Sequence, residues 1–66
     1  MFPNLRAEQA RRGLSNKEMG KIIGANQDGY ERRMRNGRFL ADECKALCSA
    51  FKCSFEYLFA TDSHSA

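Results

Sequence analysis

Residues 15–37 constrain the fold more than any other stretch, because local sequence signals in them mark where two short helices begin and end. Ser15 is followed three residues later by Glu18, the spacing of a capping box, so a helix is predicted to begin at Asn16. Gly24 follows the apolar residues of that helix. Since glycine adopts a left-handed conformation without a Cβ clash, the first helix is predicted to stop there.

A second helix is predicted over residues 27–35. Asn26 is a suitable N-cap in front of it, and an Asn-Gly pair ends it. Gly20 lies one turn before the connection, where the absence of a side chain lets the second helix pack close to the first. Two short helices joined by about three residues around a glycine form a helix-turn-helix, which is the structure that we predict here.

The second helix is predicted to have two chemically different faces. At about 100° per residue, Tyr30 and Met34 point toward the interior. The opposite side carries Asp28, Arg32 and Arg35, with Gln27 at the exposed tip. Gln27 and Arg32 suit base edges, because Gln pairs with adenine N6 and N7 and Arg with guanine O6 and N7. Asp28 repels a polyanion unless it accepts from cytosine N4 or is neutralised by Arg32.

The stretch GLSNKEMGKIIGANQDGYERRMRNG resembles the helix-turn-helix of the phage Cro/repressor-like (lambda-repressor-like) family of DNA-binding domains. NLRAEQARRGL upstream resembles the family's first helix, and FLADECKALCSAFKCSFEYLF downstream resembles its last two, so the likeness covers about residues 4–59. It implies an all-α, compact five-helix domain that binds double-stranded DNA sequence-specifically. The implied role is transcription regulation as a phage or mobile-element repressor, with the second helix reading the major groove.

The resemblance also implies contacts to the DNA backbone. In the family, the first residue of the first motif helix contacts a phosphate, and Asn16 occupies that position. Arg38 ends the turn after the reading helix, where backbone contacts are expected. Because of the side-chain chemistry of the second helix described above, the base-reading residues are predicted to be Gln27, Asp28 and Arg32. The predicted phosphate-binding residues are Asn16, Lys17, Arg33, Arg35 and Arg38.

Three further helices are predicted around this pair. The first covers residues 5–12, with Asn4 as its N-cap and an inward face of Leu5, Ala7 and Ala10. The fourth begins at Ala41 or Asp42 and ends near Phe51, and its apolar stripe is Cys44, Leu47, Cys48 and Phe51. The last covers residues 55–60 behind Ser54, and the predicted core residues near these helices are Phe39, Leu40, Phe55, Leu58 and Phe59. Residues 1–60 are thus one domain, and residues 61–66 are predicted to be a flexible tail.

Charge is unevenly distributed along the chain. Residues 1–40 hold nine Lys/Arg and four Asp/Glu, a balance of +5, whereas residues 41–66 hold two and four, a balance of −2. A basic half next to a mildly acidic half is the expected footprint of a nucleic-acid face. The alternative is an ordinary solvated surface, but four arginines between positions 32 and 38 favour the first interpretation.

Catalysis and metal binding are poorly supported. The candidate metal ligands are Cys44, Cys48, Cys53 and His64, whose spacing is not that of a zinc finger. Small buried apolar side chains explain the cysteines better. The chain has one histidine, no glycine loop that cradles a phosphate and no paired carboxylates on one face, so we expect neither an enzyme nor a cofactor, metal or small-molecule substrate.

The compartment and the partners follow from the same patterns. We expect a cytoplasmic protein, since no secretory leader and no membrane-spanning run is found. A domain with so few contacts binds DNA weakly alone, which favours a homodimer through the C-terminal helix, but an apolar last helix is equally consistent with a monomer whose small core needs every aromatic residue. The competing hypothesis is an antirepressor-like or antitoxin-like protein-interaction module on the same fold, which does not read bases. Asp28 and Gly29, on or beside the reading face, favour that alternative.

Overall fold

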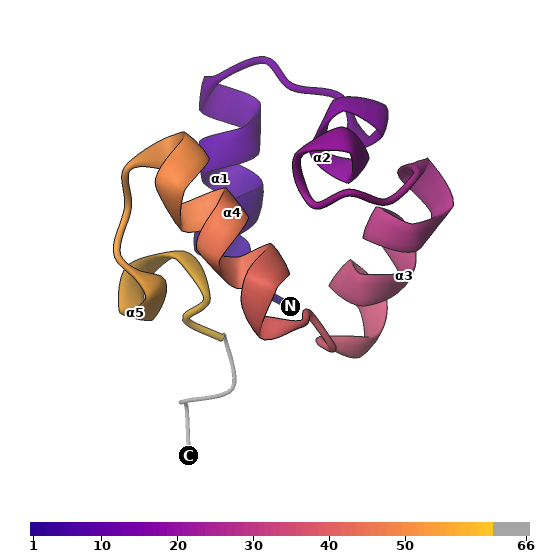
Figure 1. Cartoon of the computed structure of the whole chain (residues 1–66). Coiled ribbons are helices and arrows are strands. Elements are labelled where there is room, and N and C mark those ends of the chain that lie inside the picture. The colour runs from indigo at the N-terminus through magenta and orange to yellow at the C-terminus, as the bar shows by residue number, and fades with distance from the viewer. Residues whose placement is uncertain (62–66) are drawn as a thin grey trace.

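The computed structural model describes residues 1–61, and this part of the chain is all-helical with no strand (Figure 1). The five helices are α1 (Pro3–Arg11), α2 (Asn16–Ile22), α3 (Gln27–Asn36), α4 (Ala41–Phe51) and α5 (Phe55–Leu58). The predicted all-α, five-helix domain is therefore confirmed. Residues 62–66, which make up nearly all of the predicted tail and include His64, lie outside the described residues.

Every helix contributes one completely buried side chain to a common core. These residues are Leu5, Met19, Tyr30, Leu47 and Leu58. Three phenylalanines from distant parts of the chain pack beside them edge to face, with ring centroids 5.7 Å apart for Phe2 and Phe39 and 5.4 Å apart for Phe39 and Phe59. A chain of this length buries enough apolar surface only because all five helices share one core.

The caps predicted for α2 and α3 are confirmed. Ser15 Oγ accepts a hydrogen bond from the backbone N–H of Glu18 at 3.1 Å, and the Glu18 carboxylate accepts from the N–H of Ser15 at 2.8 Å. Asn26 Oδ1 accepts from the N–H of Gly29 at 2.7 Å. Gly37 ends α3 with a φ of +74°, a left-handed conformation that favours glycine. The caps place the start and the end of α3 where the sequence predicts them.

The start of α3 approaches α2 closely at Gly20. A Cβ at this position would lie 2.6 Å from the backbone carbon and oxygen of Asn26, which is too close for any side chain. Gly24, with a φ of +74°, reverses the chain between the two helices. The prediction that the missing side chain of Gly20 allows close packing is therefore confirmed.

The first helix begins earlier than predicted. It starts at Pro3, a residue that suits the first helical position because its missing N–H would have no partner there. Asn4 was predicted to be the N-cap, and this is wrong because Asn4 lies inside the helix. Its side-chain amide donates instead to the backbone carbonyl of Tyr57 at 2.8 Å, which ties α1 to α5.

The inward face of α1 contains a carboxylate that the sequence pattern did not indicate. Ala7 and Ala10 were predicted to face the core but are exposed, whereas Glu8 is buried. Glu8 accepts hydrogen bonds from the guanidinium group of Arg12 and from the hydroxyl of Tyr57, the latter at 2.8 Å. These hydrogen bonds, led by that of Arg12, lower the pKa of the Glu8 carboxyl. A buried carboxylate is tolerated here because its charge is paired.

Two residues predicted to reach the core lie on the surface. Leu40 is 63% exposed, because it is the N-cap of α4 and stands outside the helix. Phe55 is 58% exposed and stacks on the outer side of Phe59, with 5.3 Å between the ring centroids. Ser54 caps α5 as predicted, but the helix ends at Leu58 and not at residue 60.

Candidate nucleic-acid interface

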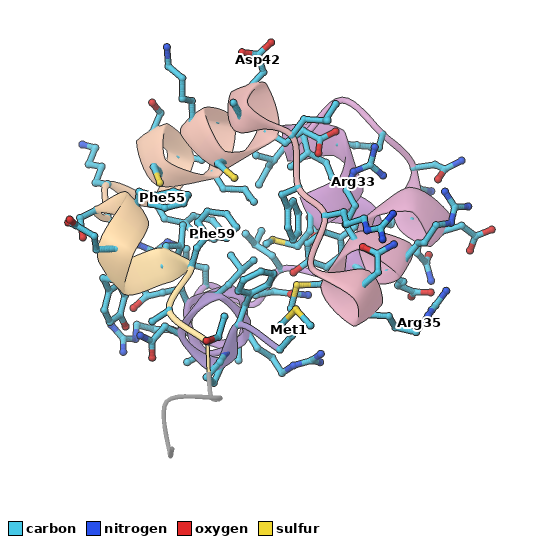
Figure 2. The ribbon with its side chains drawn as sticks, turned by 90° about the horizontal axis from the view of Figure 1, so that it is seen from below. Met1, Arg33, Arg35, Asp42, Phe55 and Phe59 are labelled. Carbon is cyan, nitrogen blue, oxygen red and sulfur yellow. The ribbon has the colours of Figure 1, made fainter. Side chains whose placement is uncertain are left out.

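The solvent-facing side of α3 carries the polar side chains that the sequence places there. Tyr30 is 1% exposed and Met34 is 5% exposed, so both point into the core as predicted. The exposed side chains are Gln27, Asp28, Arg32 and Arg35, followed by Arg38 in the next turn. We call these five residues the α3 surface. Figure 2 shows Arg35 extending away from the body of the molecule, on the side opposite Phe55.

Three cations of the α3 surface are available to an external anion. The guanidinium groups of Arg32, Arg35 and Arg38 make no ion pair with any residue in the described range 1–61. Arg38 follows a fixed turn, because its backbone N–H donates to Asn36 Oδ1 at 2.9 Å. Exposed cations that are close together and unpaired attract anions more strongly than the same cations dispersed over a surface.

Arg33 does not belong to this surface. Its Nε donates to Glu43 Oε1 at 2.8 Å, and its Nη1 donates to the carbonyl oxygen of Gly29 at 2.9 Å. The same Glu43 oxygen accepts from the backbone N–H of Leu40 at 2.9 Å. Arg33 therefore ties α3 to the first turn of α4. Its guanidinium group is engaged within the protein, which argues against the predicted phosphate contact.

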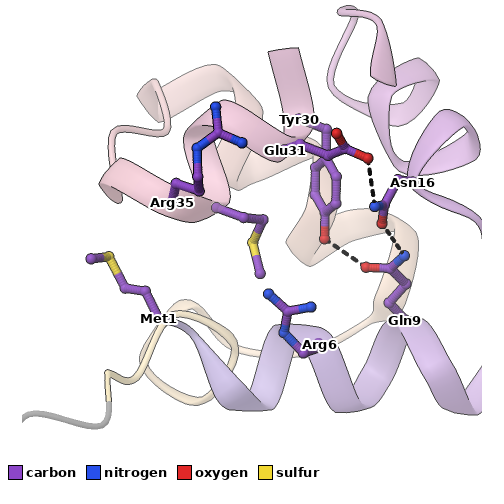
Figure 3. Close-up of a pocket in the computed structure, with 8 residues that line it drawn as sticks. Met1, Arg6, Gln9, Asn16, Tyr30, Glu31 and Arg35 are labelled. Atoms are coloured by element: carbon purple, nitrogen blue, oxygen red, sulfur yellow. Dashed lines mark hydrogen bonds between the residues drawn. The ribbon is translucent and has the colours of Figure 1, made fainter. Parts of the chain in front are cut away.

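Asn16 and Gln27 are held by a carboxylate that the sequence interpretation left out of the site. Glu31 Oε2 accepts from Asn16 Nδ2 at 2.9 Å and from Gln27 Nε2 at 3.0 Å. Gln9 Nε2 donates to Asn16 Oδ1 at 2.8 Å, and Gln9 Oε1 accepts from the hydroxyl of Tyr30 at 2.7 Å (Figure 3). We call these five residues the amide cluster. The four-residue spacing of Gln27 and Glu31 on a helix was the one sequence signal for it.

Three other residues in or beside the predicted site are Lys17, Asp28 and Gly29. Lys17 is exposed on α2. Asp28 is exposed, and within residues 1–61 no ion pair joins it to Arg32. Gly29 was expected on or beside the reading face but is buried, and a Cβ there would lie 3.2 Å from that of Ala25. The inward position of Gly29 therefore removes one of the two features that favoured the protein-interaction alternative.

Comparisons with protein families, with curated proteins and with solved structures found no match.

A cavity of about 610 Å³ adjoins the α3 surface and opens between α1, α2 and α3 (Figure 3). Four members of the amide cluster, Gln9, Asn16, Tyr30 and Glu31, line it together with Met34. Arg6 and Arg35 bring two guanidinium groups to the same cavity. Arg6 was not among the predicted contacts, because it lies on α1, far in sequence from α3. Exposed guanidinium groups thus extend from the α3 surface to Arg6 on α1.

Two of the three thiols lie on α4, and the third follows that helix. Cys44, Cys48 and Cys53 are free and half-buried, and burial raises the pKa of the Cys44 and Cys48 thiols. Raised pKa values keep these two thiols protonated, so they act as small apolar side chains. In the described part of the chain, no three His, Cys, Asp or Glu side chains are grouped to hold a metal ion. No helix within residues 1–61 combines the length and the apolar character needed to cross a membrane.

Proposed function

We propose that α2, the connection at Gly24 and α3 act as a helix-turn-helix, and that the protein binds double-stranded DNA as a sequence-specific repressor of phage or mobile-element type. The α3 surface carries this proposal, because one exposed helix face combines an amide, a carboxylate and unpaired guanidinium groups. A helix of this kind fits the major groove, where such groups read base edges. The resemblance of residues 15–37 to the Cro/repressor-like family supplies the phage attribution.

The residues of the α3 surface divide into two roles. Arg32 reads guanine O6 and N7, and Gln27 reads adenine N6 and N7. Asp28 accepts a hydrogen bond from cytosine N4, the base-edge donor that suits a carboxylate. The phosphate contacts come from the exposed cations around these residues, which are Lys17, Arg35 and Arg38. Phosphate contacts supply most of the affinity, and base contacts supply the sequence preference.

A homodimer provides the two half-sites that a small reading domain needs. We propose that it forms through α5, where Phe55 is 58% exposed and Tyr57 is 40% exposed. An almost entirely apolar groove of about 560 Å³ lies beside Phe55 and is lined also by Phe39 and Cys48. Because α5 and α3 lie on opposite sides of the molecule in Figures 1 and 2, a second copy on α5 leaves both reading helices free. A two-fold dimer of this kind is proposed to bind half-sites separated by one helical turn, about 34 Å.

The proposed compartment is the cytoplasm. Cys44, Cys48 and Cys53 are free thiols, the state that a reducing compartment maintains.

The alternative function, a protein-interaction module on the same fold, is favoured by a single observation, the unpaired carboxylate of Asp28 on the α3 surface. The response of duplex binding to salt separates the two functions.

The test is fluorescence anisotropy of a labelled duplex titrated with protein between about 50 and about 200 mM salt. If Lys17, Arg35 and Arg38 each neutralise one phosphate, log K falls with log salt with a slope of roughly −3 per protomer. The Arg35→Ala variant reduces this slope, whereas the control variant Lys52→Gln, which removes an exposed cation at the C-cap of α4, does not. Absence of salt-dependent duplex binding contradicts the DNA proposal and leaves the protein-interaction module.

A further inference from the structure

One oxygen of Glu31 holds the amides of Asn16 and Gln27, and the proposed function uses Gln27 to read a base. Glu31 Oε2 accepts from Asn16 Nδ2 at 2.9 Å and from Gln27 Nε2 at 3.0 Å. Gln27 is the first residue of α3 and Asn16 is the first residue of α2, so the carboxylate links the starts of both helices. The two hydrogen bonds lower the pKa of Glu31, so the carboxyl remains ionised at neutral pH.

The amide cluster is anchored in the core and therefore has a fixed geometry. Tyr30, which is 1% exposed, donates its hydroxyl to Gln9 Oε1 at 2.7 Å. Gln9 Nε2 donates both to Asn16 Oδ1 at 2.8 Å and to the carbonyl of Leu14 at 3.0 Å. Hydrogen bonds thus run without a break from a buried hydroxyl, through two amides, to Glu31 (Figure 3). A network with one buried end holds its exposed end more rigidly than solvent would.

The chemistry of a carboxylate decides which edge of Gln27 faces outward. An ionised carboxylate accepts hydrogen bonds and cannot donate them, so the NH₂ group of Gln27 and not its oxygen must face Glu31. One N–H of that NH₂ group is used by Glu31. If Glu31 takes the N–H that points away from Oε1, the second N–H and Oε1 together form the two-pronged edge that matches adenine N7 and N6.

We propose that Glu31 is a positioning residue that makes Gln27 an adenine reader. The inference rests on the proposed function and deepens it by naming what determines the base preference. Without Glu31 the exposed side chain of Gln27 samples several rotamers and either amide orientation, and ordering it on DNA then costs free energy that Glu31 removes in advance. The same arrangement leaves Asn16 with one unused N–H, a single donor suited to a phosphate oxygen.

A purely electrostatic role for Glu31 makes a different prediction. A negative charge beside the α3 surface repels phosphates, so its removal strengthens binding to every sequence alike. A positioning residue acts on one base pair and leaves the other positions unchanged. Glu31→Gln separates the two roles, because its Oε1 has two lone pairs and still accepts from Asn16 and Gln27 while the charge is lost.

The experiment measures the affinity of the wild type and of Glu31→Gln, Glu31→Ala, Gln27→Ala and the double alanine variant for a selected duplex and its single-base variants. The wild type is expected to prefer adenine at one position by about 5- to 150-fold, the range for one good bidentate contact. Gln27→Ala and Glu31→Ala both lose this preference, Glu31→Gln keeps it, and the double variant shows no further loss. Circular dichroism melting checks that each variant is folded. Glu31→Leu, which also lacks an acceptor, replaces Glu31→Ala if the latter is unfolded.

Each result supports or overturns the proposal. Retention of the adenine preference in Glu31→Ala overturns it, and so does its loss in Glu31→Gln. A preference that survives Gln27→Ala shows that Gln27 does not read the base, which overturns it as well. In these three cases the wild type still selects a sequence, so the proposed function stands. A wild type without duplex binding overturns the proposed function and this inference together.

Discussion

Arg33 on α3 and Glu43 on α4 form an ion pair in which Nε lies 2.8 Å from Oε1. The side chain of Arg33 is 23% exposed and that of Glu43 is 9% exposed, so the pair is largely shielded from water. Glu43 Oε1 also accepts from the backbone N–H of Leu40, at the start of α4. One carboxylate oxygen thus both caps α4 and holds α3 in place. We therefore propose that Arg33 does not contact DNA.

Replacing Arg33 tests this assignment. Arg33→Ala leaves the shielded carboxylate of Glu43 without its guanidinium partner, so the free energy of unfolding is expected to fall by about 1–3 kcal/mol. The affinity of the folded variant for a duplex is expected to stay unchanged. Urea unfolding and anisotropy measure the two quantities on the same sample. A stable Arg33→Ala protein with weakened binding would show that the arginine leaves its pair to contact phosphate.

Arg32, the adjacent residue, is expected to behave in the opposite way. It is exposed and unpaired within residues 1–61, so Arg32→Ala changes the free energy of unfolding by no more than about 0.5 kcal/mol. Binding is expected to weaken by about 1–3 kcal/mol, with relaxed preference at one guanine position, as measured against single-base duplex variants. If neither affinity nor preference changes, the reading face is wrongly assigned.

Arg38 is expected to contribute affinity without sequence preference. Arg38→Ala weakens binding to all duplexes alike and makes the slope of log K against log salt less steep by about 1, because one phosphate contact is lost. Lys52→Gln is the control, since it removes one exposed cation at the C-cap of α4. A base-specific loss in Arg38→Ala would place this residue among the base readers.

Gly20 allows a test of the packing between α2 and α3. Helix propensity alone predicts that Gly20→Ala stabilises the protein by up to about 1 kcal/mol. The added Cβ, however, would lie 2.6 Å from the backbone of Asn26, so the start of α3 must move. We therefore expect destabilisation of about 1–3 kcal/mol by chemical unfolding. An exposed alanine in α1 supplies the control Ala7→Ser, with a change within about 0.5 kcal/mol. Stabilisation by Gly20→Ala would contradict the close approach of the two helices.

The lowered pKa of Glu8 predicts how the stability of the protein depends on pH. Its folded-state pKa lies below the ordinary value of 4.5 because Arg12, and then Tyr57, donate hydrogen bonds to the ionised form. A lowered folded-state pKa means that the contribution of Glu8 is complete above about pH 4.5 and is lost as the pH falls through the folded-state value. The melting temperature of Glu8→Gln is therefore expected to lie below that of the wild type at pH 7 and to approach it at pH 3. A constant difference over this range would contradict the assignment.

The sequence predicted those features that depend on neighbours within a few residues. The capping box of Ser15 and Glu18 and the N-cap Asn26 are local signals, and they set the starts of α2 and α3 correctly. The helical period placed Tyr30 inside and Arg32 outside in the same way. The starts of these two helices and the facing of Tyr30 and Arg32 therefore required no tertiary information.

Pairings between distant residues were not accessible to that reasoning. Glu31 meets Asn16 across fifteen residues and Glu8 meets Tyr57 across forty-nine, and no periodicity within one helix encodes either contact. Glu8 was therefore missed as a core residue and Glu31 as part of the candidate site. The charge of Glu8 wrongly suggested an exposed side chain, although one of its partners, Arg12, lies only four residues away on the same helix.

Selection of duplexes from a random pool by the wild-type protein tests the central proposal most directly. We expect one motif to be enriched, with an adenine that is no longer selected by Gln27→Ala and a guanine that is no longer selected by Arg32→Ala. A pool that remains random after selection, or a motif that both variants select unchanged, would contradict the assignment of α3 as a DNA-reading helix.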